Sequence, residues 1–220
     1  IGTSVKLTLQ NGQQVREVSV VRQNITAPAV ESRINGKTGI LTVSRFNDDT
    51  VSAARKATRE FIDRGVTKVI VDLRNNPGGT VDSAQGLLGL WLNDQVVLTE
   101  RRGSETVKTL NSTGSPILEN MQTIVLINEN SASASEITAG ALRDYGKAKL
   151  VGKKSYGKGS VQVVLDLASG SQLKVTEARW YTPKGKNIDK EGIKPDVEVE
   201  LTADDVKNDK DPQLEKAESL

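Results

Sequence analysis

Short apolar runs alternate with stretches of helical spacing along most of this chain. Apolar residues that recur at three- and four-residue intervals indicate helices, and short continuous or alternating runs indicate strands. The strands expected in the first two thirds lie at 38–43, 66–73, 95–99, 106–110 and 123–127. The expected helices lie at 51–62, 80–92 and 137–145. Repeated strand-helix units predict an α/β fold, with a mostly parallel sheet and helices packed on it.

The two ends of the chain depart from this alternation. Residues 4–22 alternate apolar with polar around Asn11-Gly12, which predicts a β-hairpin with a two-residue turn there. Because two strands alone are marginally stable, the hairpin is expected to be the remnant of a larger module. Residues 24–35 are expected to be a linker. Beyond residue 149 the pattern is typical of strands, at 149–151, 161–167 and 173–181, and the charged segment 203–220 is expected to be a surface helix or a loose tail.

The composition excludes several classes of function. With 220 residues and 36% hydrophobic content, the chain can bury a sizeable core. The 30 basic and 28 acidic residues nearly cancel, and aromatic residues make up only 3%, so we expect no nucleic-acid partner. No apolar run approaches the length of a membrane span. No signal sequence opens the chain, as expected if a targeting segment has been removed.

Histidine and cysteine are absent from the sequence. A Ser-His-Asp triad, a histidine zinc helix, thiol nucleophiles and disulfides are therefore all excluded. Any catalytic base must be a carboxylate, a lysine, a tyrosine or a bound water. We expect chemistry that uses neither a metal nor a cofactor.

Residues 128–136 contain three serines alternating with alanines, between an expected strand and an expected helix. The hydroxyl of Ser133 would lie beside the unpaired amides that open the helix, where partial positive charge favours an anion. Glu136 follows three residues later, so Ser133 and Glu136 also fit a capping box. Taken alone, the local sequence favours the capping role.

Two glycine-rich turns are candidates for a second part of a site. Asn76-Pro77-Gly78-Gly79 separates an expected strand from a helix, and it is either a plain turn or a place where backbone amides approach a ligand. Residues 152–160 match the phosphate-binding loop G-x-x-x-x-G-K-[ST] at all but its last position, where Gly159 replaces the hydroxyl. A strand-like segment follows where that motif requires a helix. A nucleotide site is therefore not expected.

A serine nucleophile without histidine needs another proton acceptor. A lysine can serve if burial lowers its pKa so that the neutral amine is populated. Lys158 lies in the second glycine-rich turn, and Gln162, four residues later, could orient the amine without adding charge. The alternative for Lys158 is an ordinary exposed loop lysine.

Three blocks carry a resemblance to a known family: DLRNNPGG at 72–79, NSASASEI at 130–137 and YGKGSVQ at 156–162. In this order they closely resemble the signature blocks of the C-terminal processing (tail-specific) serine peptidases. ARWYTPKG at 178–185 and GIKPD at 192–196 are also similar to that family. The resemblance covers roughly residues 36 to 200, and a chance match to several separated blocks is improbable.

The resemblance implies a role for each candidate residue. It makes Ser133 the nucleophile, Lys158 the base 25 residues later, and Gln162 the residue that orients the lysine. The oxyanion hole would consist of the amide of Ala134 with that of Gly78 or Gly79. It also implies a crotonase-like α/β core at 36–202, preceded by the end of a PDZ domain at 1–23 and the linker, and followed by the charged tail.

The expected function is that of a serine endopeptidase that cleaves protein substrates in or near their C-terminal region through an acyl-enzyme. The expected partners are protein or peptide substrates bound through that region, with a homo-oligomer or a regulatory adaptor left open. The resemblance implies an extracytoplasmic location, in a periplasm, cell envelope or plastid lumen. Two alternatives remain: a catalytically inactive peptide-binding or scaffolding module, and an enzyme acting on thioesters, for which the sequence has no phosphate-binding motif.

Overall fold

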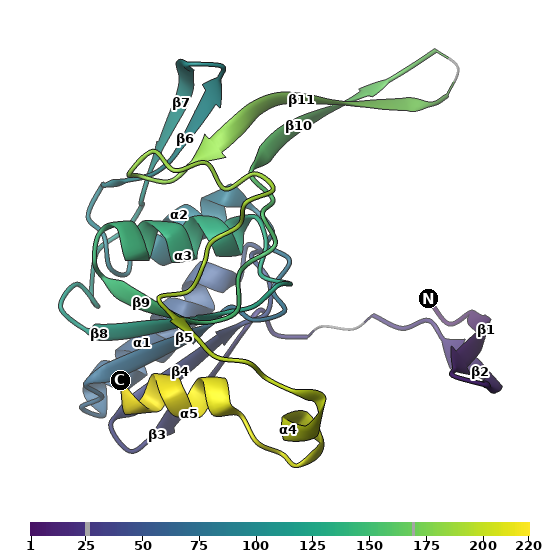
Figure 1. Ribbon diagram of the computed structural model, residues 1–220, viewed down its shortest axis with the longest axis horizontal. Coiled ribbons are helices and arrows are strands. Elements are labelled where there is room, and N and C mark those ends of the chain that lie inside the picture. The colour runs from purple at the N-terminus through teal and green to yellow at the C-terminus, as the bar shows by residue number, and fades with distance from the viewer. Residues whose placement is uncertain (25–26, 169) are drawn as a thin grey trace.

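The computed structural model describes residues 1–24, 27–168 and 170–220 (Figure 1). A six-stranded sheet in the order β12-β9-β8-β5-β4-β3 forms its centre. All neighbouring pairs except β3 with β4 are parallel, which confirms the mostly parallel sheet expected from the sequence. Its strands are β3 (Val30–Asn35), β4 (Thr38–Val43), β5 (Lys68–Asp72), β8 (Gln122–Ile127), β9 (Ala148–Gly152) and β12 (Val197–Glu198).

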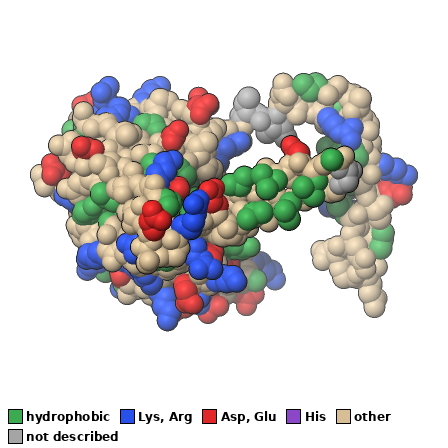
Figure 2. All heavy atoms as spheres, turned by 90° about the horizontal axis from the view of Figure 1, so that it is seen from above, with side chains coloured by type: hydrophobic (Ala, Val, Ile, Leu, Met, Phe, Trp, Pro, Cys, Tyr) green, Lys and Arg blue, Asp and Glu red, His purple; other side chains and the backbone are tan. Residues whose placement is uncertain are grey.

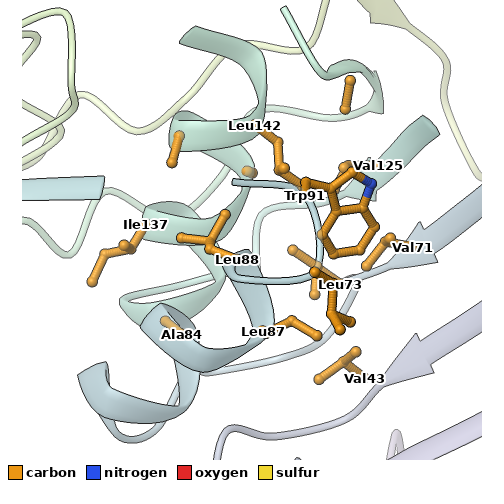
Figure 3. Packing of buried hydrophobic residues seen from close by; sticks show 14 of the residues in the cluster. Val43, Val71, Leu73, Ala84, Leu87, Leu88, Trp91, Val125, Ile137 and Leu142 are labelled. Atoms are coloured by element: carbon orange, nitrogen blue, oxygen red, sulfur yellow. The ribbon is translucent and has the colours of Figure 1, made fainter. Parts of the chain in front are cut away.

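Alternate side chains of the central strands enter two separate apolar clusters. The larger cluster lies under α1 (Thr50–Asp63), α2 (Val81–Leu88) and α3 (Ala134–Asp144), and Figure 3 shows Trp91 and Leu73 at its centre. Strand residues in it include Leu41, Val69, Val71, Val125, Ile127 and Leu150. The smaller cluster on the opposite face includes Ile40, Ile70, Ile124, Leu126 and Val151. Parallel strands covered on both faces have the nearly continuous apolar sequence seen here.

The helix predicted at 80–92 is shorter than expected. It runs only over Val81–Leu88, and residues 89–91 continue as turns. The chain leaves the helix at Gly89, where a Cβ would lie 1.9 Å from the carbonyl oxygen of Thr113. Close passage of the two segments therefore ends α2, although the apolar spacing continues.

A second sheet, entirely antiparallel, has the order β10-β11-β6-β7. Its strands are β6 (Val96–Arg102), β7 (Glu105–Asn111), β10 (Ser160–Asp166) and β11 (Gln172–Tyr181). The far part of β10 and β11 projects from the body as a two-stranded ribbon (Figure 1), and Figure 2 shows hydrophobic side chains along it. They include the exposed residues Val163, Val164, Leu165, Leu173 and Val175. The sequence predicted these strands but not which of them pair.

The expected N-terminal hairpin forms from β1 (Ser4–Asn11) and β2 (Gln14–Val21), and it stands apart from the main body (Figure 1). Its turn lies one residue later than predicted, because Asn11 pairs with Gln14 and Gly12 takes the positive φ of 59°. The assignment of this hairpin to a PDZ domain stays a prediction.

The second half of the expected linker 24–35 is edge strand β3, whose residues Val30 and Ile34 pack against the core. Two residues of that linker, 25 and 26, lie outside the described part of the chain. Residues 30–35 therefore belong to the central sheet rather than to a linker, and the linker role of the residues before β3 stays a prediction.

The charged segment 203–220 forms helices α4 (Ala203–Lys207) and α5 (Pro212–Ser219) rather than a loose tail. Ala217 is fully buried against the smaller cluster, with Leu214 beside it. The Nζ of Lys68 also donates to the carbonyl of Glu218 at 2.8 Å. Helix α5 thus covers the sheet face opposite α1, α2 and α3.

Arg74 joins α5 to the loop that follows β5. Its guanidinium makes five hydrogen bonds, of 2.6 to 3.0 Å, to the side chains of Asp72, Asp211 and Gln213. Burial alone would lower the pKa of Arg74, but the hydrogen bonds and charges of the two carboxylates raise it above its ordinary value. This network holds the loop that leads to the Pro-Gly-Gly turn.

Asp211→Asn is expected to lower the free energy of unfolding by about 1–3 kcal/mol near neutral pH, because it removes the charge that pairs with Arg74. Burial would raise the pKa of Asp211, but hydrogen bonds from Arg74 and from the amides of Leu214 and Gln213 lower it below 3.8. Since the folded-state pKa is depressed, the stabilisation is complete above pH 3.8 and is lost as the pH falls through the lower folded value.

Urea denaturation near neutral pH and at low pH tests this dependence. The difference between wild type and Asp211→Asn should shrink in acid, where the wild-type carboxyl also loses its charge. Glu215→Gln removes an equal charge from the exposed side of the same helix and should change stability little. Equal destabilisation by both variants would contradict the role given to Arg74.

Candidate active site

Ser133 lies at a sharp turn between β8 and α3. Its backbone has φ 58° and ψ −118°, a conformation that residues other than glycine rarely adopt. Its residue surface is only 6% exposed. Strained strand-to-helix turns of this kind present nucleophiles in several hydrolases. The position predicted for the nucleophile is therefore sterically unusual.

The capping role predicted from the local sequence is only half fulfilled. Ser133 and Glu136 are arranged as a capping box, in which the Ser133 N–H donates to Glu136 Oε2 at 2.9 Å. The Glu136 N–H, however, donates to the Ser133 carbonyl at 2.9 Å, and the Ser133 hydroxyl makes no hydrogen bond to the helix end. The glutamate is the capping side chain, and the serine hydroxyl remains available.

The two serines that flank Ser133 hold the turn in place. Ser131 Oγ donates to the carbonyl of Leu73 at 2.8 Å, and Ser135 Oγ donates to the carbonyl of Asn76 at 3.0 Å. Both serines are fully buried. Of the three alternating serines, Ser131 and Ser135 therefore hold the turn through their hydroxyls, whereas the Ser133 hydroxyl does not.

The Pro-Gly-Gly turn packs directly on Ser133. A Cβ on Gly78 would lie 2.7 Å from Ser133 Cβ, and one on Gly79 would lie 1.9 Å from the carbonyl oxygen of Phe46. Their φ values of 100° and 147° are also in the range that favours glycine. Both glycines are therefore needed for close backbone approach, which a plain turn would not require.

The amides around Ser133 differ in their hydrogen bonding. The Gly78 N–H donates to Asn76 Oδ1 at 2.8 Å. Within the described residues, the amides of Ala134 and Gly79 donate to no protein acceptor. The Ala134 amide also opens α3, where the helix dipole favours a negative charge. Of the predicted oxyanion donors, Ala134 and Gly79 are the two with an unused hydrogen in this arrangement.

Glu136 links the turn that carries Ser133, here called the serine turn, to the loop 153–159 that carries Lys158, here called the lysine loop. Its carboxylate is fully buried and accepts four hydrogen bonds. Besides the Ser133 amide, the donors are Ser155 Oγ at 2.6 Å, the Gly157 amide at 2.7 Å and the Lys158 amide at 2.9 Å. One side chain therefore fixes the backbones of both candidate catalytic residues. The sequence indicated Glu136 only as a cap, and nothing in the local pattern marks its link to a loop some twenty residues away.

The side chains of Lys158 and Gln162 are not assembled around Ser133 in this structure. Lys158 is exposed, and within the described part of the chain its Nζ makes no hydrogen bond to Ser133 Oγ. Gln162 is exposed on β10, opposite Thr176 and next to a break in the strand register. The structure thus brings the backbones of the two loops together through Glu136, whereas the side chains of Lys158 and Gln162 extend into solvent.

Comparison with known proteins decides the family. A model of peptidase family S41 matches residues 37–199. The chain belongs to this family. A probable CtpA-like serine protease of Staphylococcus haemolyticus (strain JCSC1435) is 39% identical over 201 residues, which are 90% of this S41 chain and 40% of that protein. Its counterpart in Staphylococcus aureus (strain COL) gives the same identity and the same shares.

A solved structure also resembles this S41 chain. The photosystem II D1 C-terminal processing protease is 28% identical, with a TM-score of 0.76 over 90% of this chain and 56% of that one. Together with the family match, this confirms the α/β fold class and the resemblance to C-terminal processing peptidases that the three blocks indicated. This S41 chain spans about two fifths of the length of the curated relatives it matches.

Among the helices of its described residues, none combines the length and apolar character needed to cross a bilayer.

Proposed function

We propose that this S41 chain is a serine endopeptidase that cleaves protein substrates in or near their C-terminal region through an acyl-enzyme. The observation that carries the proposal is the environment of Ser133. Its hydroxyl makes no hydrogen bond to a described residue, it lies on a strained turn, and the amide of Ala134 beside it is also without an acceptor there. The unused amide of Gly79 would be the second donor. Preorganised donors of this kind stabilise the oxyanion that forms only in the tetrahedral intermediate.

The reaction uses Ser133, Lys158 and Gln162 in the roles expected from the sequence. Ser133 Oγ attacks the substrate carbonyl while neutral Lys158 takes its proton, and the lysine then delivers a proton to the leaving amine. A water molecule, deprotonated by the same amine, releases the acyl group. Since Lys158 is exposed in this structure, its side chain must turn toward Ser133 when substrate binds. Catalytic hydrogen bonds often tighten only in the substrate complex.

The proposal extends to partners and location. The substrates are proteins or peptides bound through their C-terminal region, and the site of action is extracytoplasmic, in a periplasm, cell envelope or plastid lumen. A homo-oligomer or a regulatory adaptor is compatible with this function. The catalytically inactive peptide-binding module is the second candidate. The observation that favours it is that Lys158 is exposed and its Nζ makes no hydrogen bond to Ser133 Oγ within the described part of the chain.

Labelling with a fluorophosphonate, which phosphonylates activated serines, tests the proposal. We expect one adduct per chain by intact mass, located at Ser133 by peptide mapping, with no adduct on Ser133→Ala. The adduct should form much more slowly on Lys158→Ala, because the hydroxyl then lacks its base. A scaffolding module would instead leave Ser133 unlabelled and bind C-terminal peptides without cutting them.

A further inference from the structure

An arginine-lined cavity of about 270 Å³ lies where β11 meets the β6–β7 hairpin. Arg101, Arg102, Arg179 and Tyr181 line it, together with Glu177. Arg179 is the strand partner of Arg101, so both are placed at the same level of the sheet. The role proposed above for Ser133 and its neighbours does not use this cavity.

The charges around the cavity are unevenly paired. Arg102 forms an ion pair with Glu177 at 2.5 Å, and Arg179 Nε lies 3.4 Å from a carboxylate oxygen of Asp189. Arg101 forms no ion pair or hydrogen bond with any described residue, and its guanidinium lies 4.4 Å above the ring of Tyr181. The cavity therefore has one arginine whose charge is not matched by a carboxylate.

Arg101 Nε is a buried side-chain donor without a hydrogen-bond partner among the described residues, and Arg101 lines this cavity. Thr99 Oγ1, two residues earlier on the same side of β6, also has no partner there, whereas the equally unpaired Trp180 Nε1 belongs to the core on the other side of the sheet. Buried polar groups are nearly always paired, and a buried donor of a charged group that lacks an acceptor is especially costly. The unpaired Arg101 Nε, beside a cavity that Arg101 itself lines, therefore points to an external acceptor there.

We propose that this cavity binds the C-terminal carboxylate of the substrate, with Arg101 as the main ligand. A guanidinium placed over an aromatic ring still offers its planar fork of donors, which matches the two oxygens of a carboxylate. This inference rests on the proposed function, because it names the end of the substrate that such a peptidase would recognise.

The position of the cavity suits this role. Ser160, two residues after Lys158, is the strand partner of Arg179, and the Trp180 amide donates to the Gly159 carbonyl at 2.7 Å. The cavity residue Arg179 is thus paired, through the β10–β11 ladder, with the residues that directly follow Lys158. An extended substrate tail that follows this register from the loop would bring its C-terminus to Arg101.

A binding experiment that does not depend on catalysis tests the inference. Two fluorescent peptides of identical sequence, one ending in a free carboxylate and one in an amide, are titrated with Ser133→Ala and followed by anisotropy. We expect amidation to weaken binding about tenfold. In Ser133→Ala/Arg101→Gln the ratio of the two affinities should fall to about one, since the neutral side chain no longer favours the charged end.

Arg102→Gln is the matched control, because Arg102 lines the same cavity but is already paired with Glu177; in the Ser133→Ala background it should keep the tenfold ratio. Arg101→Lys keeps the charge without the fork and should give an intermediate ratio, which also covers the case in which Arg101→Gln fails to fold. Any carboxylate binding elsewhere in the protein is common to all these variants, so a change in the ratio reports on Arg101.

Three results would each overturn the inference: no effect of amidation in Ser133→Ala, an undiminished ratio in Arg101→Gln, or an equal loss of the ratio in Arg102→Gln. A third peptide, amidated but carrying a terminal aspartate side chain, identifies the source of the carboxylate. If it binds as tightly as the free acid, the site recognises acidic side chains and the inference is wrong. Because binding is measured without turnover, the outcome is separate from that of the serine labelling.

Discussion

Lys158→Ala should lower the kcat for peptide cleavage by about ten-thousand-fold or more, with little change in fold. No histidine exists to take over proton transfer, and the nearby carboxylate of Glu136 already accepts four hydrogen bonds. The fold should survive because the Lys158 side chain is exposed and only its backbone amide takes part in the Glu136 contacts. Hydrolysis of a fluorogenic peptide, together with thermal unfolding, measures both parts of the expectation.

Two further variants sharpen this test. Lys158→Arg should be as inactive as the alanine variant, because a guanidinium cannot be deprotonated at working pH. Lys154→Ala is the matched control, since Lys154 is an exposed lysine of the same loop, and it should keep its activity. Undiminished turnover in Lys158→Ala would refute the serine-lysine mechanism.

Glu136→Gln should have the second largest effect, on both stability and rate. Each carboxylate oxygen accepts two hydrogen bonds. In the glutamine variant one oxygen becomes an NH2 group, which cannot accept, so two buried donors lose their acceptor. We expect a loss of about 3–5 kcal/mol in the free energy of unfolding. We also expect kcat to fall by about a hundredfold, because the backbones of Ser133 and Lys158 are no longer held in register.

Urea denaturation and steady-state kinetics of Glu136→Gln separate the two effects. If Glu136 positions the two loops, kcat falls even at temperatures where the variant is fully folded. If the variant only loses stability, activity falls only in proportion to the unfolded fraction, and kcat per folded molecule stays that of wild type. Glu129→Gln, at an exposed position shortly before the serine turn, is the control and should resemble wild type. Wild-type stability and kcat in Glu136→Gln would show that the four hydrogen bonds do not matter.

Much of the core fold followed from the sequence because the strands are locally encoded. Continuous apolar runs predicted β5 and β8 within two residues at each end, since buried parallel strands need apolar side chains on both faces. The pairing of β11 with β6 was not predictable, because it joins segments far apart in the sequence whose composition does not indicate a partner. The docking of α5 was missed for a similar reason: Ala217 lies in a charged segment, and its anchor, Arg74, is remote in the chain.

The candidate site shows the same division. The signature blocks located Ser133, and the lack of histidine directed attention to Lys158. The hydrogen bonds of Ser131, Ser135 and Glu136 join three loops that are far apart in the sequence, so the local pattern could not predict these structural roles. For Lys158 the sequence left a buried base and an exposed loop lysine as alternatives, and it gave no indication that Gln162 is exposed, since a motif fixes residue types while side-chain rotamers depend on what surrounds them.

Helix α5 has a consequence for how this protein is made. Residues 211–219 leave the ribosome after every strand of the central sheet, yet they supply the cover for Ile70 and Leu126 and, in Asp211 and Gln213, three of the five hydrogen bonds of Arg74. Until they emerge, a nascent chain keeps one side of its sheet bare and the loop that carries Gly78 and Gly79 without its anchor. We therefore expect the candidate catalytic loops to reach their final arrangement only after synthesis has passed this helix, and a chain arrested earlier to expose apolar surface to chaperones and proteases.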